Sequence, residues 1–106
     1  MALWDKSDVA GWVDAKQRVS LRVMDGMRTH PPRWRQAVVW ITCSTLILAG
    51  DPAKGGSCPP ETVQQGQTLN SSIQVINVPE AGHQIRREAF STYMEAVRSF
   101  LGAHMA

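Results

Sequence analysis

His83 and Asp51 each stand in a loop that follows a short apolar run, and together these residue types can do acid–base chemistry. An imidazole takes up and returns a proton near neutral pH, and a carboxylate bonded to one ring nitrogen fixes its tautomer. If the two runs are neighbouring parallel strands, the loops beyond their carboxyl ends meet at one edge of the sheet. The two residues are therefore a candidate catalytic pair.

Each of these residues also has a structural interpretation. A single histidine after a glycine is usually a turn residue, and an aspartate such as Asp51 can cap a turn through a side-chain hydrogen bond to the backbone. Arg86 and Arg87, which follow His83, are most simply a solvated first helical turn, although an arginine at a pocket mouth also suits an anionic substrate. Both interpretations stay open at this point.

The sequence offers no evident nucleophile. The string nearest to a Gly-x-Ser-x-Gly elbow, residues 55–59 (GGSCP), lacks the second glycine and follows the run that precedes Asp51. Cys58 would need an activated thiol to replace the serine, and nothing in the sequence indicates one. Cys43 and Cys58 are expected to be reduced thiols, and their spacing with the three histidines fits no common zinc site. We expect neither a metal nor a cofactor.

The elements that must position these residues follow from the hydrophobic spacing. Residues 45–49 and 73–78 predict two strands, and the first, apolar throughout, is typical of a strand buried on both faces. Pro59 or Pro60 opens a helix that lasts to about Asn70. Strand, helix and strand imply a right-handed crossover and parallel pairing. Because parallel sheets usually contain several strands, the sequence predicts an α/β chain that lacks some of its sheet.

Further helices are expected on both sides of this unit. Residues 7–30 have a helical spacing of apolar residues, with Ser7 or Asp8 as N-cap and a stop at Pro31-Pro32. A short helix is expected from residue 33 to 39 or 40. The clearest helix starts near Phe90, repeats apolar residues at three- and four-residue steps, and is expected to end at Gly102.

Three segments, taken together, resemble the acid and histidine regions of α/β-hydrolases. They are residues 46–52 (LILAGDP), 59–61 (PPE) at a helix start, and 79–87 (PEAGHQIRR). The acid precedes the histidine, as in that family, whose triad runs serine, acid, histidine. The resemblance covers residues 33–102, and residues 1–32 resemble the end of the helical cap. It implies a helical region 1–32 and a C-terminal α/β-hydrolase-like segment 33–106, with two parallel strands, a crossover helix and a terminal helix.

The resemblance implies an ester- or amide-hydrolysing serine hydrolase in which His83 takes the serine proton and Asp51 orients the imidazole. The chain departs from the family at several points. Ser44 stands where proline is common, and Asp51 follows Gly50 at once, whereas many members place the acid about three residues later. The nucleophile elbow and the oxyanion loop are not found. Without them a histidine and an acid supply at best general-base assistance of about 10²–10⁴.

Composition and charge limit the kinds of partner that the chain is expected to bind. The 43% hydrophobic and 19% charged composition is that of an ordinary globular protein, and 106 residues suit one domain. The net charge is +2, and because the basic residues are dispersed we expect no nucleic-acid partner. The tryptophans near Arg33 and Arg35 are more simply core residues with a charged rim. No signal peptide or membrane-spanning stretch is evident, so a cytosolic protein without a membrane partner is expected.

Two functional hypotheses follow. The first is an α/β-hydrolase-like chain that keeps the acid and the histidine, acts on a small ester or amide, and shows little triad activity by itself. The second is a non-catalytic interaction or structural module, or one half of a split hydrolase. A second copy of the chain, most simply in a twofold dimer, or a missing N-terminal half would pack against its uncovered strands.

Overall fold

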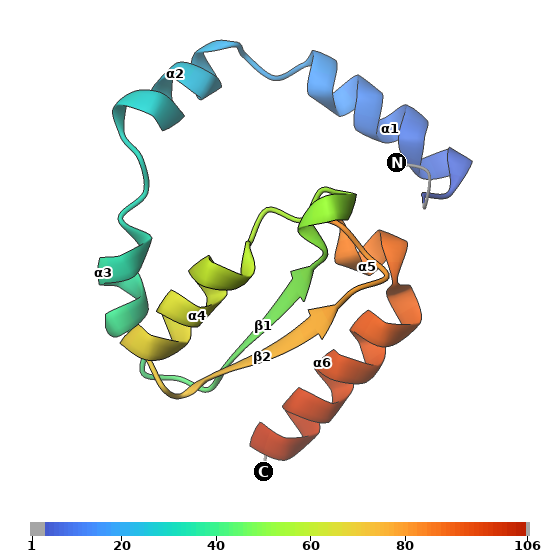
Figure 1. Cartoon of the computed structure of the whole chain (residues 1–106). Coiled ribbons are helices and arrows are strands. Elements are labelled where there is room, and N and C mark those ends of the chain that lie inside the picture. Colours follow the sequence, from blue (N-terminus) through green and yellow to red (C-terminus); the bar gives the residue numbers. More distant parts are fainter. Residues whose placement is uncertain (1–3, 106) are drawn as a thin grey trace.

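Two parallel strands form the sheet in the computed structural model, which describes residues 4–105 (Figure 1). β1 (Thr45–Gly50) pairs with β2 (Ile73–Val78) residue for residue, from Thr45 opposite Ile73 to Gly50 opposite Val78. α4 (Pro60–Leu69) connects them. The predicted strands, their parallel pairing and the connecting helix are confirmed. The chain is a mixed α/β structure.

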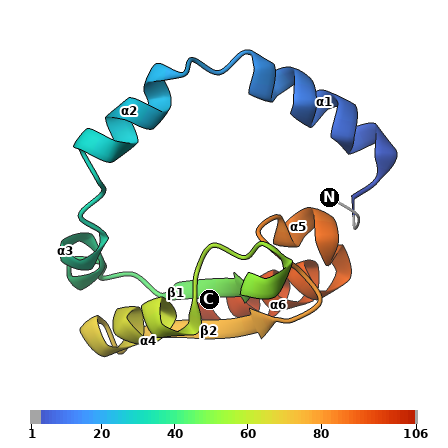
Figure 2. The ribbon, with the colours of Figure 1, turned by 45° about the horizontal axis from the view of Figure 1, so that its top comes forward.

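Helices lie on both sides of the strands. α4 packs on β2, and α5 (Ile85–Glu88) contacts both β1 and α6 (Phe90–His104). Figures 1 and 2 show α4 and α6 on either side of the two strands. The prediction that Gly102 ends the last helix is wrong, because α6 continues through it to His104, whose Nδ1 lies 2.8 Å from the Phe100 carbonyl oxygen.

The buried core is small and lies near the carboxyl ends of the strands. Val78, Ala81 and Ala89 form one cluster, against which Ile85 packs. Small side chains dominate the buried set, which consists of Ala49, Val63, Ile73, Val78, Ala81, Ala89 and Ala96. Since burial stabilises a fold in proportion to the apolar area removed from water, this core stabilises the fold less than one built from leucine and phenylalanine.

β1 is less covered than its sequence predicts. Apart from Ala49, its residues are only half-buried, whereas the apolar run predicts a strand buried on both faces. β2 is buried only at its two ends, Ile73 and Val78, whereas Gln74, Ile76 and Asn77 are exposed. The residues in the described part of the chain therefore do not cover the apolar sides of β1.

Three helices precede the sheet and form an arc (Figure 2). They are α1 (Lys6–Gln17), α2 (Arg22–Thr29) and α3 (Trp34–Val39). The prediction of one helix over residues 7–30 is wrong, because residues 18–21 interrupt it: the Arg18 amide bonds back to Ala15, and the Ser20 hydroxyl accepts from the Arg22 amide. The N-cap is Asp5 rather than Ser7 or Asp8. Its carboxylate accepts from the Ser7 hydroxyl and amide, and these bonds lower the pKa of Asp5.

The arc leaves apolar side chains in solvent. None of the three helices contains a buried residue, and only α3 packs closely on another helix, α4. The Asn70 amide joins the two by donating to the carbonyl oxygens of Val38 and Ile41, each at 3.0 Å. No helix within residues 4–105 is long and apolar enough to cross a bilayer. The exposed apolar residues of the arc are Val13, Val19, Leu21, Val23, Met24, Met27, Val39 and Trp40.

The loops that follow the two strands are packed backbone to backbone. The Asp51 amide donates to the Ala81 carbonyl oxygen at 2.6 Å. A methyl group on Gly50 would overlap the Gly82 carbonyl oxygen, and one on Gly82 would overlap the carbonyl oxygen of Lys54. Only glycine fits at these two positions, because the obstructing atoms are backbone atoms and cannot swing aside.

We therefore expect Gly50→Ala to lower the free energy of unfolding by roughly 3 kcal/mol or more, because the added carbon forces the two loops apart. Gly66→Ala is the matched control: a methyl group there meets no atom within 4 Å, and alanine in a helix gains roughly 0.5–1 kcal/mol over glycine. Urea unfolding followed by circular dichroism measures both. A Gly50→Ala protein as stable as the parent would contradict the close packing.

Candidate functional site

His83 lies in the loop between β2 and α5, and its imidazole is exposed. Its Nδ1 is 2.9 Å from the hydroxyl oxygen of Ser57, which belongs to the loop after β1. The two loops that the parallel strands bring to one edge therefore meet side chain to side chain. The ring partner of His83 is a hydroxyl and not a carboxylate.

Asp51 bonds to the backbone of its own loop and not to His83. Its carboxylate accepts from the Ala53 amide at 2.9 Å and caps the short 3₁₀ helix η1 (Pro52–Lys54). No hydrogen bond or ion pair joins Asp51 to His83 in the part of the chain that the structure describes. The loops are adjacent, as expected from the strand order, but the acid sits on the backbone of its own loop. This is the capping role that the sequence left open.

Glu88, which is not among the residues predicted from the sequence, is the carboxylate that supports the histidine loop. Its Oε1 accepts from the Gly82 amide at 2.8 Å, and its Oε2 accepts from the Trp4 indole N–H at 3.1 Å. The bond to Gly82 spans six residues, and a glutamate shortly after a Gly-His turn is a sequence signal for such a bond. The bond to Trp4 spans 84 residues, and no local pattern indicates it.

The turn before His83 is anchored from two directions. The Lys54 ammonium donates to the Pro79 carbonyl oxygen at 2.8 Å. The Thr92 hydroxyl donates to the Glu80 carboxylate at 2.6 Å, and this bond lowers the pKa of Glu80. The histidine loop is thus tied to η1 on one side and to α6 on the other.

A hollow of about 270 Å³ opens beside His83. A second hollow, of about 140 Å³, is lined by both Asp51 and Cys58. Asp51 and His83 therefore line different hollows, which separates the two residues of the expected pair. The lining of the first hollow consists of Trp4, Trp12, Lys16, Lys54, Gly55, His83, Gln84 and Glu88.

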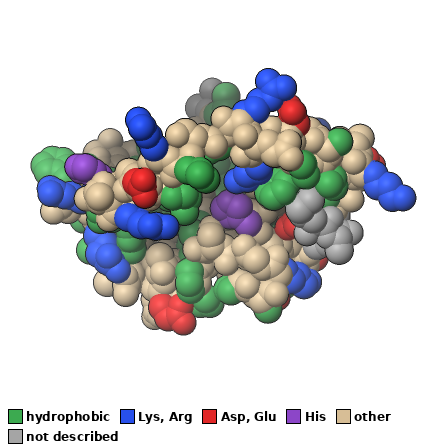
Figure 3. Space-filling model, turned by 90° about the horizontal axis from the view of Figure 1, so that it is seen from above, with side chains coloured by type: hydrophobic (Ala, Val, Ile, Leu, Met, Phe, Trp, Pro, Cys, Tyr) green, Lys and Arg blue, Asp and Glu red, His purple; other side chains and the backbone are tan. Residues whose placement is uncertain are grey.

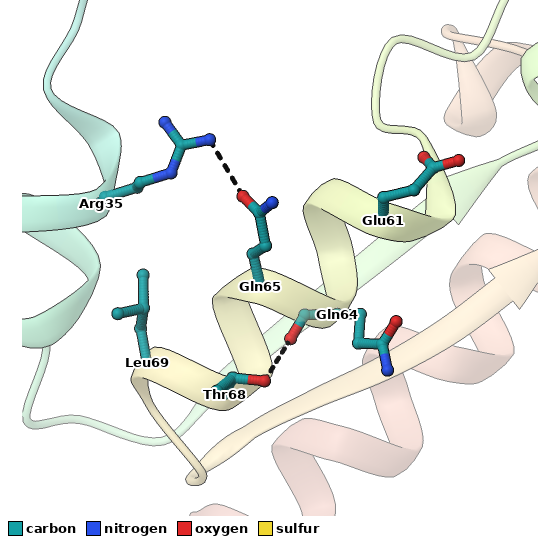
Figure 4. A pocket seen from close by; sticks show the side chains of 6 residues that line it. All are labelled: Arg35, Glu61, Gln64, Gln65, Thr68 and Leu69. Atoms are coloured by element: carbon teal, nitrogen blue, oxygen red, sulfur yellow. Dashed lines mark hydrogen bonds between the residues drawn. The ribbon is translucent and has the colours of Figure 1, made fainter.

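A larger hollow, of about 400 Å³, lies between α3 and α4 (Figure 4). Arg35 donates to the Gln65 side chain across it at 2.9 Å, and Glu61 lies at its far end in Figure 4. No histidine, cysteine or serine lines it. Its size alone does not make it a catalytic site, because the Thr68 hydroxyl donates to the Gln64 carbonyl oxygen and is not paired with the Glu61 carboxylate as a nucleophile with its base.

The surroundings of Ser57 do not form an oxyanion hole from the neighbouring glycines. The Gly55 amide donates to Pro52, the Gly56 amide to Asp51, and the Gly82 amide to Glu88. Donors that are already engaged cannot also stabilise a developing oxyanion. Ser57 and His83 therefore form a hydrogen-bonded pair to which these three glycine amides offer no oxyanion donor.

The two cysteines are free and exposed. Within residues 4–105 no group of three or more histidine, cysteine, aspartate and glutamate side chains is placed to hold a metal ion. The candidate chemistry thus comes from the imidazole of His83.

Comparison of this chain with known protein families, with curated proteins and with solved structures found no match.

The structure predicts that Ser57, and not Asp51, sets the state of the His83 ring. We expect Ser57→Ala to change the two ¹⁵N shifts of the His83 imidazole above neutral pH, because the ring loses the partner that fixes its tautomer. Asp51→Asn is the control, and the ring shifts should stay as in the parent. Long-range ¹H–¹⁵N NMR reports the tautomer directly. A shift with Asp51→Asn and none with Ser57→Ala would reverse the assignment.

Proposed function

We propose that this chain carries the histidine part of an α/β-hydrolase-like site for a small ester or amide, with His83 as the general base. The observation that supports this best is the position of His83, in a loop at the carboxyl ends of two parallel strands, with its Nδ1 held by Ser57. Functional groups of open α/β sheets gather at that edge. The sequence resemblance gives the same residue.

In this proposal Nε2 of His83 does the chemistry. Nδ1 contacts Ser57, whereas Nε2 has no hydrogen-bond partner among the described residues and is open to a water molecule or to a substrate. The ring takes a proton from the attacking water and returns it to the leaving group. Asp51 acts through the loop, because it caps η1 and so shapes the segment that leads to Ser57. The 106 residues supply no elbow serine, so this chain alone provides base assistance only.

A second function, an interaction module, is favoured by the uncovered apolar surface. The half-buried β1 and the exposed apolar arc would be covered by a second copy of the chain or by a polypeptide that supplies more of the sheet. Each large aliphatic side chain that becomes buried contributes roughly 1.5–3 kcal/mol. Several such side chains are comparable with the whole stability of a small domain, about 5–15 kcal/mol.

The enzymatic proposal predicts slow ester hydrolysis that depends on His83. With p-nitrophenyl acetate we expect a rate above the uncatalysed one by a factor of at most about 10²–10⁴, since base assistance is the only contribution. His83→Ala should abolish the excess rate, whereas His104→Ala, which removes an exposed histidine at the end of α6, should retain it. Equal rates in the parent and the His83→Ala variant would remove the role of His83.

A fluorophosphonate probe separates base catalysis from a complete triad. Such probes label a serine only when it is activated and oxyanion donors are in place, and the glycine amides near Ser57 are engaged elsewhere. We therefore expect no covalent adduct by intact-mass spectrometry. A stoichiometric adduct on Ser57 would mean that the loop rearranges into an active nucleophile site.

The module proposal predicts self-association through the arc. Light scattering after size-exclusion chromatography should give a mass of about twice 11.7 kDa. The double change Val23→Asp and Met27→Asp places charge on two exposed apolar positions of α2 and should give the monomer mass. Ser99→Asp on the exposed side of α6 is the control. A folded parent protein at the monomer mass would exclude a stable dimer.

A further inference from the structure

The hollow beside His83 has an aromatic wall supplied by the N-terminal segment. The rings of Trp4 and Trp12 lie edge to face, with centroids 5.7 Å apart and planes at 87°. The Trp4 indole is held by its bond to Glu88, which belongs to α5. Edge-to-face pairs of this kind present both a ring face and a ring edge to a neighbour, and a third aromatic ring can add to them.

Cations surround this wall. The Lys16 ammonium lies 5.4 Å from the Trp12 ring centroid, and the Arg87 guanidinium lies 4.7 Å from that of Trp4. Lys54 lines the hollow as well, with one of its three donors on the Pro79 carbonyl. Figure 3 shows basic and hydrophobic side chains next to each other on the face seen from above.

The single acid among the described residues that line the hollow is Glu88, and both of its carboxylate oxygens already accept hydrogen bonds, from Gly82 and from Trp4. Lys16 forms no ion pair with a described residue, and His83 keeps one ring nitrogen open. The hollow therefore contains more positive than negative charge, together with ammonium donors of Lys16 and Lys54 that no described residue uses. This balance favours an anion over a cation.

We propose that this hollow binds a small aromatic carboxylate, with the ring against Trp4 and Trp12 and the carboxylate between Lys16 and His83. The volume, about 270 Å³, lies just below the usual range of small-molecule sites, roughly 300–1,000 Å³, and so admits one ring with a short acidic arm. The inference rests on the proposed function in that it names the substrate or product class of the His83 site. An aryl ester that carries or releases a carboxylate would suit it.

Binding of phenylacetate tests this without turnover. In a ¹H–¹⁵N NMR titration at low salt we expect the Trp4 and Trp12 indole signals and the His83 signals to shift together. Phenylacetamide, which lacks the charge, and acetate, which lacks the ring, should bind about tenfold more weakly or not at all, since each removes one half of the recognition.

Matched substitutions locate the site. Lys16→Met keeps the aliphatic stem and removes the charge, and it should weaken phenylacetate binding about two- to fivefold, the range for an exposed charge pair. Lys6→Met, on the same helix but outside the hollow, should leave the affinity unchanged. Since both lysines are exposed, both variants should fold, and the spread of their amide signals checks it.

Three results would overturn the inference: equal binding of phenylacetamide, equal binding of acetate, or shifts confined to residues outside the hollow. The outcome is independent of hydrolysis. Phenylacetate binding with no His83-dependent hydrolysis rejects the enzymatic proposal alone, and His83-dependent hydrolysis with no phenylacetate binding rejects the ligand class alone.

Discussion

The close packing of three backbone segments at Gly50, Gly82 and Lys54 is the contact on which the rest of the site depends. Parallel strands bring two loops to one edge, but they do not fix how the loops meet. Here the absence of two side chains lets the backbones touch, and the bond from the Asp51 amide to the Ala81 carbonyl closes the junction. Backbone contacts of this kind hold a loop more firmly than exposed side-chain contacts, because little conformational freedom remains to be lost.

This junction positions Ser57, His83 and Glu88. Gly56 follows η1 and lies against the Asp51 carbonyl, which brings Ser57 toward the imidazole. Glu88 reaches back to the Gly82 amide and at the same time accepts from Trp4, so the N-terminal segment is tied to the loop that bears the histidine. One carboxylate thus joins the start of the chain to the candidate site.

Much of the fold could be predicted from the sequence, because local patterns determine it. The apolar runs, the prolines before α4 and the repeat along α6 are short-range signals, and the parallel pairing follows from the handedness of crossovers. The break at residues 18–21 could not be predicted from spacing alone, since the apolar periodicity runs across it and the Ser20 hydroxyl decides it. The continuation of α6 through Gly102 is similar, because glycine is permitted in the last turn of a helix without ending it.

The candidate site could be predicted only in part. Strand order indicated that the loops of Asp51 and His83 are neighbours, but not which oxygen meets the ring, because that depends on a few ångströms of loop path. A carboxylate close to a free backbone amide, as Asp51 is to Ala53, is captured locally before it can serve a distant partner. The contact of Trp4 with Glu88 has no local signal at all.

Amide hydrogen exchange tests whether the glycine junction holds the histidine loop in place. We expect the amides of Asp51 and Gly82 to exchange as slowly as those that pair β1 with β2, because both donate within the packed junction. The amides between α1 and α2 should exchange much faster. If the amides of Asp51 and Gly82 exchange at the rate of an unprotected loop while the strand amides stay protected, the loops are not held together and the placement of His83 beside Ser57 is wrong.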